Sequence, residues 1–491
     1  MSSFSSPRVV FIGKKEIYGQ IDDHEFSLDS KIKDDVFKMR PLLKDFLEKY
    51  GGKSLTEYGV DIFQNQLVTP ELNRRNEFLV TFKRLITERL GETIANEIVA
   101  QLEKYYVVST ADHHSPLGPS FSLNSNLIAT SGYGKIADPF LKYIIVLSCA
   151  SVSLNNDHFP RGLFFHVLRN EKFELERLSF LPSNSHSSAV YHFRRYLQSE
   201  VDKVQKLLNE KRRAGLIQEN QVEILQEILN KIYNRPEMFE CRDYSEQMTK
   251  TNLLLWKHVF STKFFSPPDL VYLEQERVVA ELIIDHHINE DTVIHRLIFD
   301  PQYLELLVQP LTVAMNKHVR QGFQGTELFW AISLDKNQRL SLHRQGEELI
   351  SHDGNWRISI QPEAISKALK EGILVPNLLV VFTVLVLYYG LNCLGGFNQM
   401  HYLTSMQETY GHLALDSVSS KANTRLYDYG LQALYLKSDN EKIFVTALDL
   451  ALYDFEERWR NIQQGFSQLS VKQALLVSFP EFFSILSERN Q

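Results

Sequence analysis

The residues best suited to catalysis stand in one polar segment that directly follows an apolar run. YYVVST (Tyr105 to Thr110) is rich in β-branched and aromatic residues, which is typical of a buried strand. The polar segment after it carries Asp112, His113 and His114. Histidine is the best general acid or base near neutral pH, and a carboxylate can orient an imidazole. Because successive residues of an extended chain point to opposite sides, we expect at most one of the two histidines to face a pocket.

Two more polar loops follow apolar runs further along the chain. YIIVLSCA (Tyr143 to Ala150) predicts a second buried strand, and SVSLNNDHFPRG and LPSNSHSS come after it. Ligands of open α/β sheets bind outside the carboxyl ends of the strands, so we expect these loops to line one pocket for a small-molecule substrate. Arg161 could clamp a carboxylate or a phosphate there. The candidate ligand-binding residues are Asn124, Asn126, Asn155, Asn156, His158, Arg161 and His186.

A second group of candidate ligand-binding residues comes late in the chain, in GLNCLGGFNQMHY. The glycine pair permits a close backbone approach or a positive φ, and the polar side chains after it can bind a ligand by hydrogen bonds. The alternative interpretation is an ordinary turn between two buried elements. The candidates in this group are Gly395, Gly396, Gln399 and Tyr402.

The triplet Asp-His-His occurs twice and opens a metal-dependent alternative. It ends at His114 and again at His287, and it resembles the metal-binding signature of the DHH phosphoesterases. Those enzymes also use an Asp-x-Asp loop after a strand, and this sequence has none. We therefore assign no metal ligands, and the sequence identifies no cofactor. A metal-dependent phosphoesterase or hydrolase remains the alternative enzyme class.

Composition excludes several classes of protein. The chain has 491 residues, of which 44% are hydrophobic, so it can bury large cores. A formal charge of −7 gives no overall basic surface for nucleic acid or anionic lipid, so we expect neither partner. Three widely spaced cysteines and a start without a signal peptide favour the cytoplasm. The apolar stretch from Leu374 to Phe397 is interrupted by polar residues and is expected to be a buried element rather than a membrane span.

The pattern of helices and strands expected around these residues predicts an α/β fold. Two helices are expected from Thr69 to Lys104, one from Leu273 to His287 and one from Pro362 to Glu371. Apolar residues at heptad spacing between Tyr191 and Asn234 predict a helical hairpin of coiled-coil type. We expect a Rossmann-like core with this hairpin inserted and a largely helical C-terminal part. The expected divisions are 1–190, helices and first part of the core; 191–235, the hairpin; 236–420, second part of the core; and 421–491, the helical C-terminal region.

Two short patches resemble the bacillithiol synthase family, the putative cysteine ligases. Thr110, Gly118-Pro119 and Phe121 are similar to that family's early T-G-Q-Q-x-G…G-P-L-Y loop. Gly395, Gly396, Gln399 and Tyr402 are similar to its late G-G-x-x-E-I-x-Y segment, and the order of the patches agrees. The resemblance implies a Rossmann-like core with a helical coiled-coil extension. It also implies a cytoplasmic activity that joins cysteine to a glucosaminyl malate acceptor.

Three functions are therefore compared. The first is a cytoplasmic enzyme acting on a small polar or anionic metabolite, a ligase or transferase of the bacillithiol synthase type. The second is the metal-dependent phosphoesterase or hydrolase. The third is a non-enzymatic binding or scaffold protein, and the helical hairpin is where we expect a partner or a second copy of the chain to bind.

Overall fold

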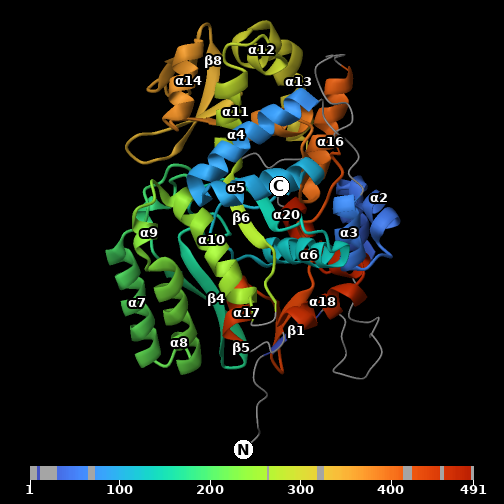
Figure 1. The fold of residues 1–491 in the computed structure, drawn as a ribbon, viewed down its shortest axis with the longest axis vertical. Helices are drawn as coiled ribbons and strands as arrows, with labels where there is room; N and C mark the ends of the chain where they lie inside the picture. Colours follow the sequence, from blue (N-terminus) through green and yellow to red (C-terminus); the bar gives the residue numbers. More distant parts are fainter. Residues whose placement is uncertain are drawn as a thin grey trace, which may run out of the picture.

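A four-stranded parallel sheet lies near the middle of the molecule (Figure 1). The computed structural model describes residues 8–11, 30–64, 72–262, 265–317, 326–412, 423–453 and 458–487. The strands occur in the order β12 (Asn392–Leu394), β2 (Val107–Ser109), β3 (Tyr143–Ser148) and β6 (Asp269–Glu274). Each neighbouring pair is parallel, so all four carboxyl ends lie at one edge of the sheet.

Both faces of this sheet are buried, as the unbroken apolar runs predict. Ile144 and Val146 of β3 belong to one hydrophobic core, together with side chains of α6 (Ser120–Ile136) and α10 (Tyr244–Phe260). Ile145 and Leu147 belong to a second core on the other face. That core also contains side chains of α4 (Leu72–Leu90), α5 (Glu92–Lys104) and α11 (Gln275–His286). Helices on both faces of a parallel sheet confirm the α/β class.

The predicted helical hairpin is present at the lower left of Figure 1. It consists of α7 (Gln198–Arg213) and α8 (Glu219–Ile228), which continues as a π-helical turn over Leu229–Tyr233. The heptad positions Val201, Val204 and Leu208 are buried. The hairpin also packs against β5 (Lys172–Ser179), which pairs antiparallel with β4 (Gly162–Arg169). The apolar seam of the hairpin is therefore buried within this chain.

A separate antiparallel sheet lies at the top of Figure 1. Its order is β10 (Arg357–Ser359), β9 (Glu348–Ser351), β8 (Arg339–Gln345), β7 (Phe329–Ile332) and β11 (Leu374–Pro376). The helices grouped with it are α12 (Val293–Phe299), α13 (Gln309–Asn316) and α14 (Pro362–Lys370). This unit places Arg339 and Trp330 beside the loop that follows β3, because Trp330 shares a small apolar cluster with Ala150.

The long apolar stretch forms a buried connection, as predicted. From β11 it runs through α15 (Leu378–Phe382) and a π-helical segment (Thr383–Tyr388) into β12. Among the residues that the structure describes, no helix has both the length and the apolar character needed to cross a membrane. The stretch therefore serves to carry the chain from the antiparallel sheet back to the parallel one.

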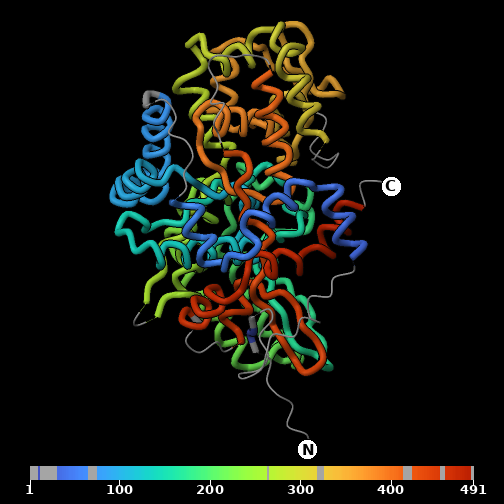
Figure 2. The backbone as a smooth tube through the Cα atoms, turned by 90° about the vertical axis from the view of Figure 1, so that its right-hand side faces the viewer, coloured from blue at the N-terminus to red at the C-terminus, as the bar shows by residue number. Residues whose placement is uncertain are grey.

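The C-terminal part contains more strand than the sequence predicted. After α16 (Phe397–His412), β13 (Leu434–Lys437) and β14 (Lys442–Phe444) form a three-stranded sheet with β1 (Arg8–Phe11). The helices that follow are α17 (Ala447–Leu452), α18 (Arg458–Gln468), α19 (Val471–Leu476) and α20 (Phe479–Ser487). The N-terminal helices α1 (Ser30–Met39), α2 (Pro41–Tyr50) and α3 (Leu55–Gln64) pack beside this part (Figure 2).

One strand beside a predicted helix was missed. The helix expected from about Leu273 begins at Gln275, because Leu273 and Glu274 are the last residues of β6. The strand DLVYLE runs straight into the helix without a glycine or proline, so no turn residue marks the boundary. This correction matters because it places Gln275 at the carboxyl edge of the parallel sheet. The expected start of the first helix at Thr69 lies outside the described residues.

Candidate functional site

The carboxyl ends of all four parallel strands surround a cavity of about 230 Å³. His113 follows β2, Cys149 follows β3, Gln275 follows β6 and Gly396 follows β12. The side chains of α15, α16 and the segment before β13 complete the wall, with Phe382, Phe397, Tyr402 and Tyr429 among them. The structure thus brings the early and late polar patches of the sequence to one place.

The two patches are joined directly. β12 pairs with β2, and the backbone N–H of Thr110 donates to the carbonyl oxygen of Leu394 at 2.9 Å. The Gln399 Nε2 donates to Thr110 Oγ1 at 2.7 Å. Gly395 permits this contact, since a Cβ atom there would lie only 2.2 Å from Gln399 Cδ. Gly396 therefore lines the cavity, and Gly395 lets Gln399 reach the early patch.

The two adjacent histidines have different surroundings. His113 lines the cavity. The ring of His114 is fully buried, with Nδ1 2.7 Å from Ser148 Oγ and Nε2 2.8 Å from the carbonyl oxygen of Ser245. The hydrogen bonds of His114 tie the loop after β2 to β3 and α10. Only one of the two histidines faces the cavity, in keeping with the opposite directions of neighbouring side chains.

Asp112, His158 and Tyr429 form a chain of polar contacts that ends at the cavity. Asp112 Oδ1 lies 3.1 Å from His158 Nδ1, and His158 Nε2 lies 2.8 Å from the Tyr429 hydroxyl. Tyr429 lines the cavity, whereas Asp112 is buried behind it. A carboxylate beside one imidazole nitrogen fixes which nitrogen carries the proton. We call these three residues the Asp112 relay.

The Asp112 carboxylate is held in its charged form. Burial alone would raise its pKa, but the neighbouring His158 and the hydrogen bonds from Tyr272 and Ser122 bring the pKa below its ordinary value. The Tyr272 hydroxyl donates to Oδ2 at 2.5 Å and the Ser122 hydroxyl to Oδ1 at 2.7 Å. Asn126 Nδ2 in turn donates to the Tyr272 hydroxyl at 3.3 Å. A carboxylate with several donors stays charged in a buried site.

Burial also raises the pKa of Tyr429 well above its ordinary value, and the negative charge of Asp112 raises it further. The phenol therefore keeps its proton at neutral pH. Its hydroxyl can donate that proton to His158 only while it receives another one. Tyr429 is thus suited to passing protons along rather than to holding a negative charge.

The His113 ring packs against the ring of His158, and His113 is neutral. Its ring centroid lies 4.2 Å from that of His158, and its Nδ1 lies 3.2 Å from Asn156 Oδ1. Burial and the nearby His158 lower the pKa of His113 to about 3. The same Asn156 Oδ1 accepts a hydrogen bond from the backbone N–H of His158 at 2.9 Å. Asn156 therefore positions both imidazoles.

Several predicted site residues lie away from the cavity wall. Asn124 is fully buried, and its amide bonds Gln432 and the backbone of Ala433. Asn155 is exposed. These two residues therefore belong to the packing and the surface of the fold.

The predicted anion clamp also has another environment. The guanidinium of Arg161 contacts His186 Nε2 and lies 5.2 Å from the centre of the Phe159 ring. Neither Arg161 nor His186 lines the cavity. The clamp expected for a carboxylate or phosphate is thus absent from the wall that the described residues form.

Cys149 lines the cavity but is a poor nucleophile. Its Sγ lies 3.3 Å from Glu276 Oε1, and burial together with the charge of Glu276 raises the pKa of the thiol. Glu276 accepts hydrogen bonds from the backbone N–H groups of Ala150 and Ser151 at 3.0 and 2.9 Å. A protonated thiol beside a carboxylate is unreactive. Cys149 and Glu276 therefore shape the cavity by fixing the loop after β3.

Sequence reasoning missed three residues of the site. Tyr429 and Asp428 lie in YDYG, a segment expected to be helical, and Gln275 lies beyond a strand that was not recognised. Asp428 Oδ2 accepts from Ser125 Oγ at 2.5 Å, whereas Oδ1 is buried without a partner among the described residues. Burial raises the pKa of Asp428 to about 7. The aromatic and acidic residues around Gly430 are the one signal that could have drawn attention to this turn.

No metal centre is found among the residues that the structure describes, in the sense that no group of three or more His, Cys, Asp or Glu side chains is arranged to hold an ion. The second Asp-His-His triplet lies at the end of α11. There Arg84 contacts Asp285 at 2.7 Å, and His287 Nδ1 lies 3.0 Å from Thr292 Oγ1. This triplet is therefore remote from the parallel-sheet cavity and bonded within the fold.

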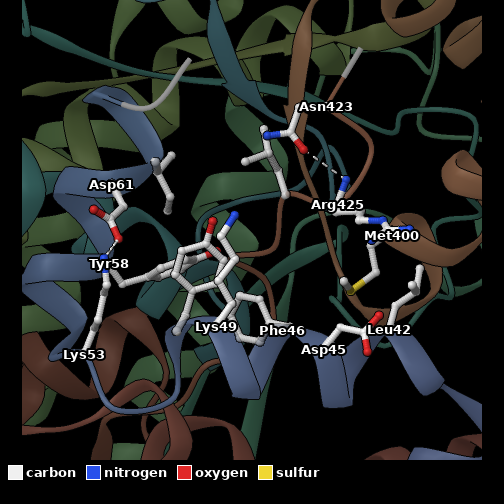
Figure 3. A pocket seen from close by; sticks show the side chains of 13 residues that line it. Leu42, Asp45, Phe46, Lys49, Lys53, Tyr58, Asp61, Met400, Asn423 and Arg425 are labelled. Atoms are coloured by element: carbon white, nitrogen blue, oxygen red, sulfur yellow. Dashed lines mark hydrogen bonds and ion pairs between the residues drawn. The ribbon is translucent and has the colours of Figure 1, made fainter. Parts of the chain in front are cut away.

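A wider cavity of about 490 Å³ lies between α2, α3 and α16 (Figure 3). Figure 3 shows Lys53 turned toward Asp61, which it contacts, and Asn423 beside Arg425. The Tyr58 hydroxyl donates to the carbonyl oxygen of Tyr427. Tyr58 in the wall of this cavity therefore holds the backbone at Tyr427, just before Asp428 and Tyr429.

Comparison of the chain with protein-family models and with curated proteins returned no match.

Proposed function

We propose that the protein is an enzyme that removes a proton from a small polar metabolite bound at the carboxyl edge of the parallel sheet. The observation that carries this proposal is the Asp112 relay, which connects a buried carboxylate to a hydroxyl group on the cavity wall. Proton transfer by positioned side chains is among the commonest contributions of an active site. Deprotonation of an amine, hydroxyl or thiol is the step that a ligase or transferase needs in its acceptor substrate.

The relay moves a proton without leaving a buried charge unpaired. In the proposed relay His158 carries its proton on Nδ1, 3.1 Å from Asp112 Oδ1, which leaves Nε2 to accept from the Tyr429 hydroxyl. A substrate proton passes to the Tyr429 oxygen while the tyrosine proton passes to His158 Nε2. The resulting imidazolium is stabilised by the Asp112 carboxylate, and the substrate becomes a nucleophile. The high pKa of Tyr429 suits this route, since the phenol never accumulates as an anion.

The resemblance to bacillithiol synthases suggests what the nucleophile would attack. We propose that the core is Rossmann-like. We also propose that the early and late patches together bind the substrate, and the hydrogen bond from Gln399 to Thr110 supports this joint role. A ligase of this type would join an amine or thiol such as that of cysteine to a sugar-linked acceptor. The new bond would form as a leaving group departs from an acceptor carbon that a nucleoside triphosphate has activated. The proposed setting is the cytoplasm, where the three buried free cysteines stay reduced.

The test is metabolite consumption. Purified protein is incubated with a cytoplasmic metabolite extract, and separately with L-cysteine, glucosaminyl malate and a nucleoside triphosphate, and both mixtures are followed by mass spectrometry. We expect the wild type to consume at least one metabolite, and Tyr429→Phe and His158→Asn to do so at least about 100-fold more slowly, the usual scale for a lost acid–base group.

Tyr435→Phe is the matched control. Tyr435 stands on β13 with its ring 4.9 Å from that of Phe444, remote from the cavity lining. Its loss should leave the rate unchanged. An extract that the wild type leaves unaltered, or one that Tyr429→Phe consumes as fast as the wild type, would reject the enzyme proposal.

A further inference from the structure

The side chain of Gln275 is fully buried and has no hydrogen-bond partner in the described part of the chain. It is the first residue of α11, immediately after β6, and it lines the parallel-sheet cavity. Its relative exposure is 0%, and neither Oε1 nor Nε2 has a partner among the residues that the structure describes. A buried amide loses its hydrogen bonds to water, so leaving both its atoms unpaired is costly. Such a group in a cavity wall indicates that a ligand supplies the missing partners.

Other fully buried glutamines of this chain are satisfied. Gln247 Nε2 donates to the carbonyl oxygens of Tyr196 and Met238, and its Oε1 accepts from the Tyr196 N–H at 2.8 Å. Gln432 donates to Ser120 Oγ at 2.8 Å and accepts from Asn124. The fold therefore pairs both polar atoms of these two buried glutamines within the protein. Gln275, which lines the cavity, has neither atom paired among the described residues.

The cavity offers no charged partner for an ionic ligand. Among the described residues that line it there is no Lys, Arg, Asp or Glu. Its two most readily ionised groups are neutral near pH 7, because His113 has a pKa of about 3 and the pKa of Cys149 is raised. Arg339 acts on Cys149 and His113 from outside the wall, where its guanidinium lies 4.8 Å from the centre of the Trp330 ring. An uncharged group fits this wall best, because burying an unpaired charge is costly.

Apolar and aromatic side chains face the remaining volume. Leu378 and Phe382 come from α15, Phe397 from the start of α16 and Tyr402 from its second turn. Pockets of this kind hold a ligand by apolar contact and orient it with a few polar groups. A carboxamide presents one donor beside one acceptor, so its complement presents one acceptor beside one donor. A neutral amide edge has that arrangement.

We propose that Gln275 is the residue by which this cavity recognises a neutral amide edge on its ligand, an N–H donor next to an acceptor. The inference names the class of ligand for the proposed active site, and it rests on the proposed function only in treating that ligand as the substrate. Two sources share this chemistry, a carboxamide group and the amino edge of a nucleobase such as adenine. The cavity and the Gln275 contacts are the same in both cases.

The experiment uses two matched pairs of small probes and the full chain. Nicotinamide is compared with 3-acetylpyridine, which keeps the acceptor but lacks the N–H donor, and adenine is compared with purine, which lacks the amino group. Binding is measured by titration calorimetry and by saturation-transfer NMR. We expect the wild type to bind nicotinamide or adenine at least tenfold more tightly than its partner probe. Preference within the first pair assigns a carboxamide, and preference within the second assigns a nucleobase.

Gln275→Met tests the residue itself, since methionine keeps the length and removes both polar atoms. The variant should lose the discrimination within the preferred pair, and its melting temperature should equal or exceed that of the wild type. The matched Gln247→Met should melt at a lower temperature, because it leaves the Tyr196 N–H and two carbonyl groups unpaired. Gln275→Leu provides a second variant, which should also lose the discrimination because leucine has neither a donor nor an acceptor.

Wild-type protein that distinguishes neither pair, or a Gln275→Met variant that distinguishes the preferred pair as well as the wild type does, would overturn the inference. Tyr429→Phe separates this result from the proposed function. That variant should keep the probe preference while losing turnover. Probe preference without metabolite consumption by the wild type would reject the enzyme proposal alone, and consumption without probe preference would reject the Gln275 inference alone.

Discussion

At the scale of single residues, the site is governed by which polar groups find a partner. Asp112 has several donors and stays charged, whereas Asp428 has one satisfied oxygen and one unpaired oxygen. Both carboxyls are buried, so the difference between their pKa values follows from their neighbours. His158 and two hydroxyl donors lower the pKa of Asp112, whereas the charge of Asp112 raises that of Asp428. The two acids therefore have opposite effects on stability as the pH changes.

Asp428 should destabilise the folded protein as the pH rises. Its pKa is about 7 in the folded protein and near 3.8 ordinarily, so the folded state holds the proton more tightly. The folded protein then loses stability from about pH 4 to pH 7 and no further above that. Asp428→Asn removes this dependence. Its stability advantage over the wild type should grow by about 3 kcal/mol between about pH 5 and pH 8.

The measurement is chemical denaturation of both proteins at the two pH values. Comparing the variant with the wild type cancels the opposite effect of His113, whose lowered pKa makes the folded protein more stable as the pH rises toward about 6.5. Asp34→Asn, at an exposed position of α1, is the control and should show no such growth. An advantage for Asp428→Asn that stays constant with pH would contradict the assignment of a raised pKa.

The predicted pocket residues that contact one another are those that follow recognisable strands. Asp112, His113, Asn156 and His158 were predicted to share a pocket region, and contacts among them are present. Arg161 was predicted from residue type alone, yet its guanidinium contacts a neighbouring loop histidine. Residue type indicates what a side chain can bind but not which of several nearby groups it meets first.

At the scale of elements, a close crossing of two helices positions one of the helices that contact the site. α3 and α6 cross where Gly59 faces Gly132, and a Cβ atom on Gly132 would lie 2.6 Å from the carbonyl carbon of Gly59. The same helix α6 carries Ser122 to Asp112 and Ser125 to Asp428. Because neither glycine has a side chain, α6 can lie close to α3, and this position lets both hydroxyls reach their carboxylates.

Gly132→Ala should separate the two helices and destabilise the protein by about 1–3 kcal/mol. Gly134→Ala is a control on the same helix, where a Cβ atom meets only Gln463 Nε2 at 3.4 Å. At that exposed position alanine should stabilise the helix by about 0.5–1 kcal/mol, as in other helix interiors. Thermal denaturation of the two variants checks the opposite signs. A Gly132→Ala variant as stable as Gly134→Ala would show that the crossing is not tightly packed.

Prediction of secondary structure failed where a strand and the neighbouring helix have similar sequence patterns. β6 and α11 are both apolar and have no turn residue between them, so they read as one helix. The strands β13 and β14 are four and three residues long, too short for alternation to be visible within a region of helical pattern. The heptads of α7 and α8 were recognisable because their apolar period extends over several turns.

At the scale of the whole molecule, the site depends on strand order. β12 lies beside β2 although most of the chain separates them, and the cavity is lined by residues from Thr110 to Tyr429. Local periodicity gives no information about such pairing, because the energy that selects it comes from burying both faces of the completed sheet. The α/β class was therefore predictable, whereas the meeting of Gln399 with Thr110 was not.

The long insertions between the strands also have a role at this scale. The antiparallel sheet places Trp330 against Ala150, so it supports the loop that carries Cys149. The segment that leaves this sheet through β11 supplies Phe382 to the cavity before it enters β12. Both halves of the chain are thus needed to close one cavity, and the site cannot be assigned to any single stretch of sequence.

The position of one proton tests the Asp112 relay most directly. In protein labelled with ¹⁵N in its histidines, long-range ¹H–¹⁵N NMR distinguishes the two imidazole nitrogens, and the spectrum of His158→Asn identifies the signals of His158. We expect neutral His158 to carry its proton on Nδ1, facing Asp112, with Nε2 accepting from Tyr429. A proton on Nε2 would place the lone pair of Nδ1 against the Asp112 carboxylate and would contradict the relay.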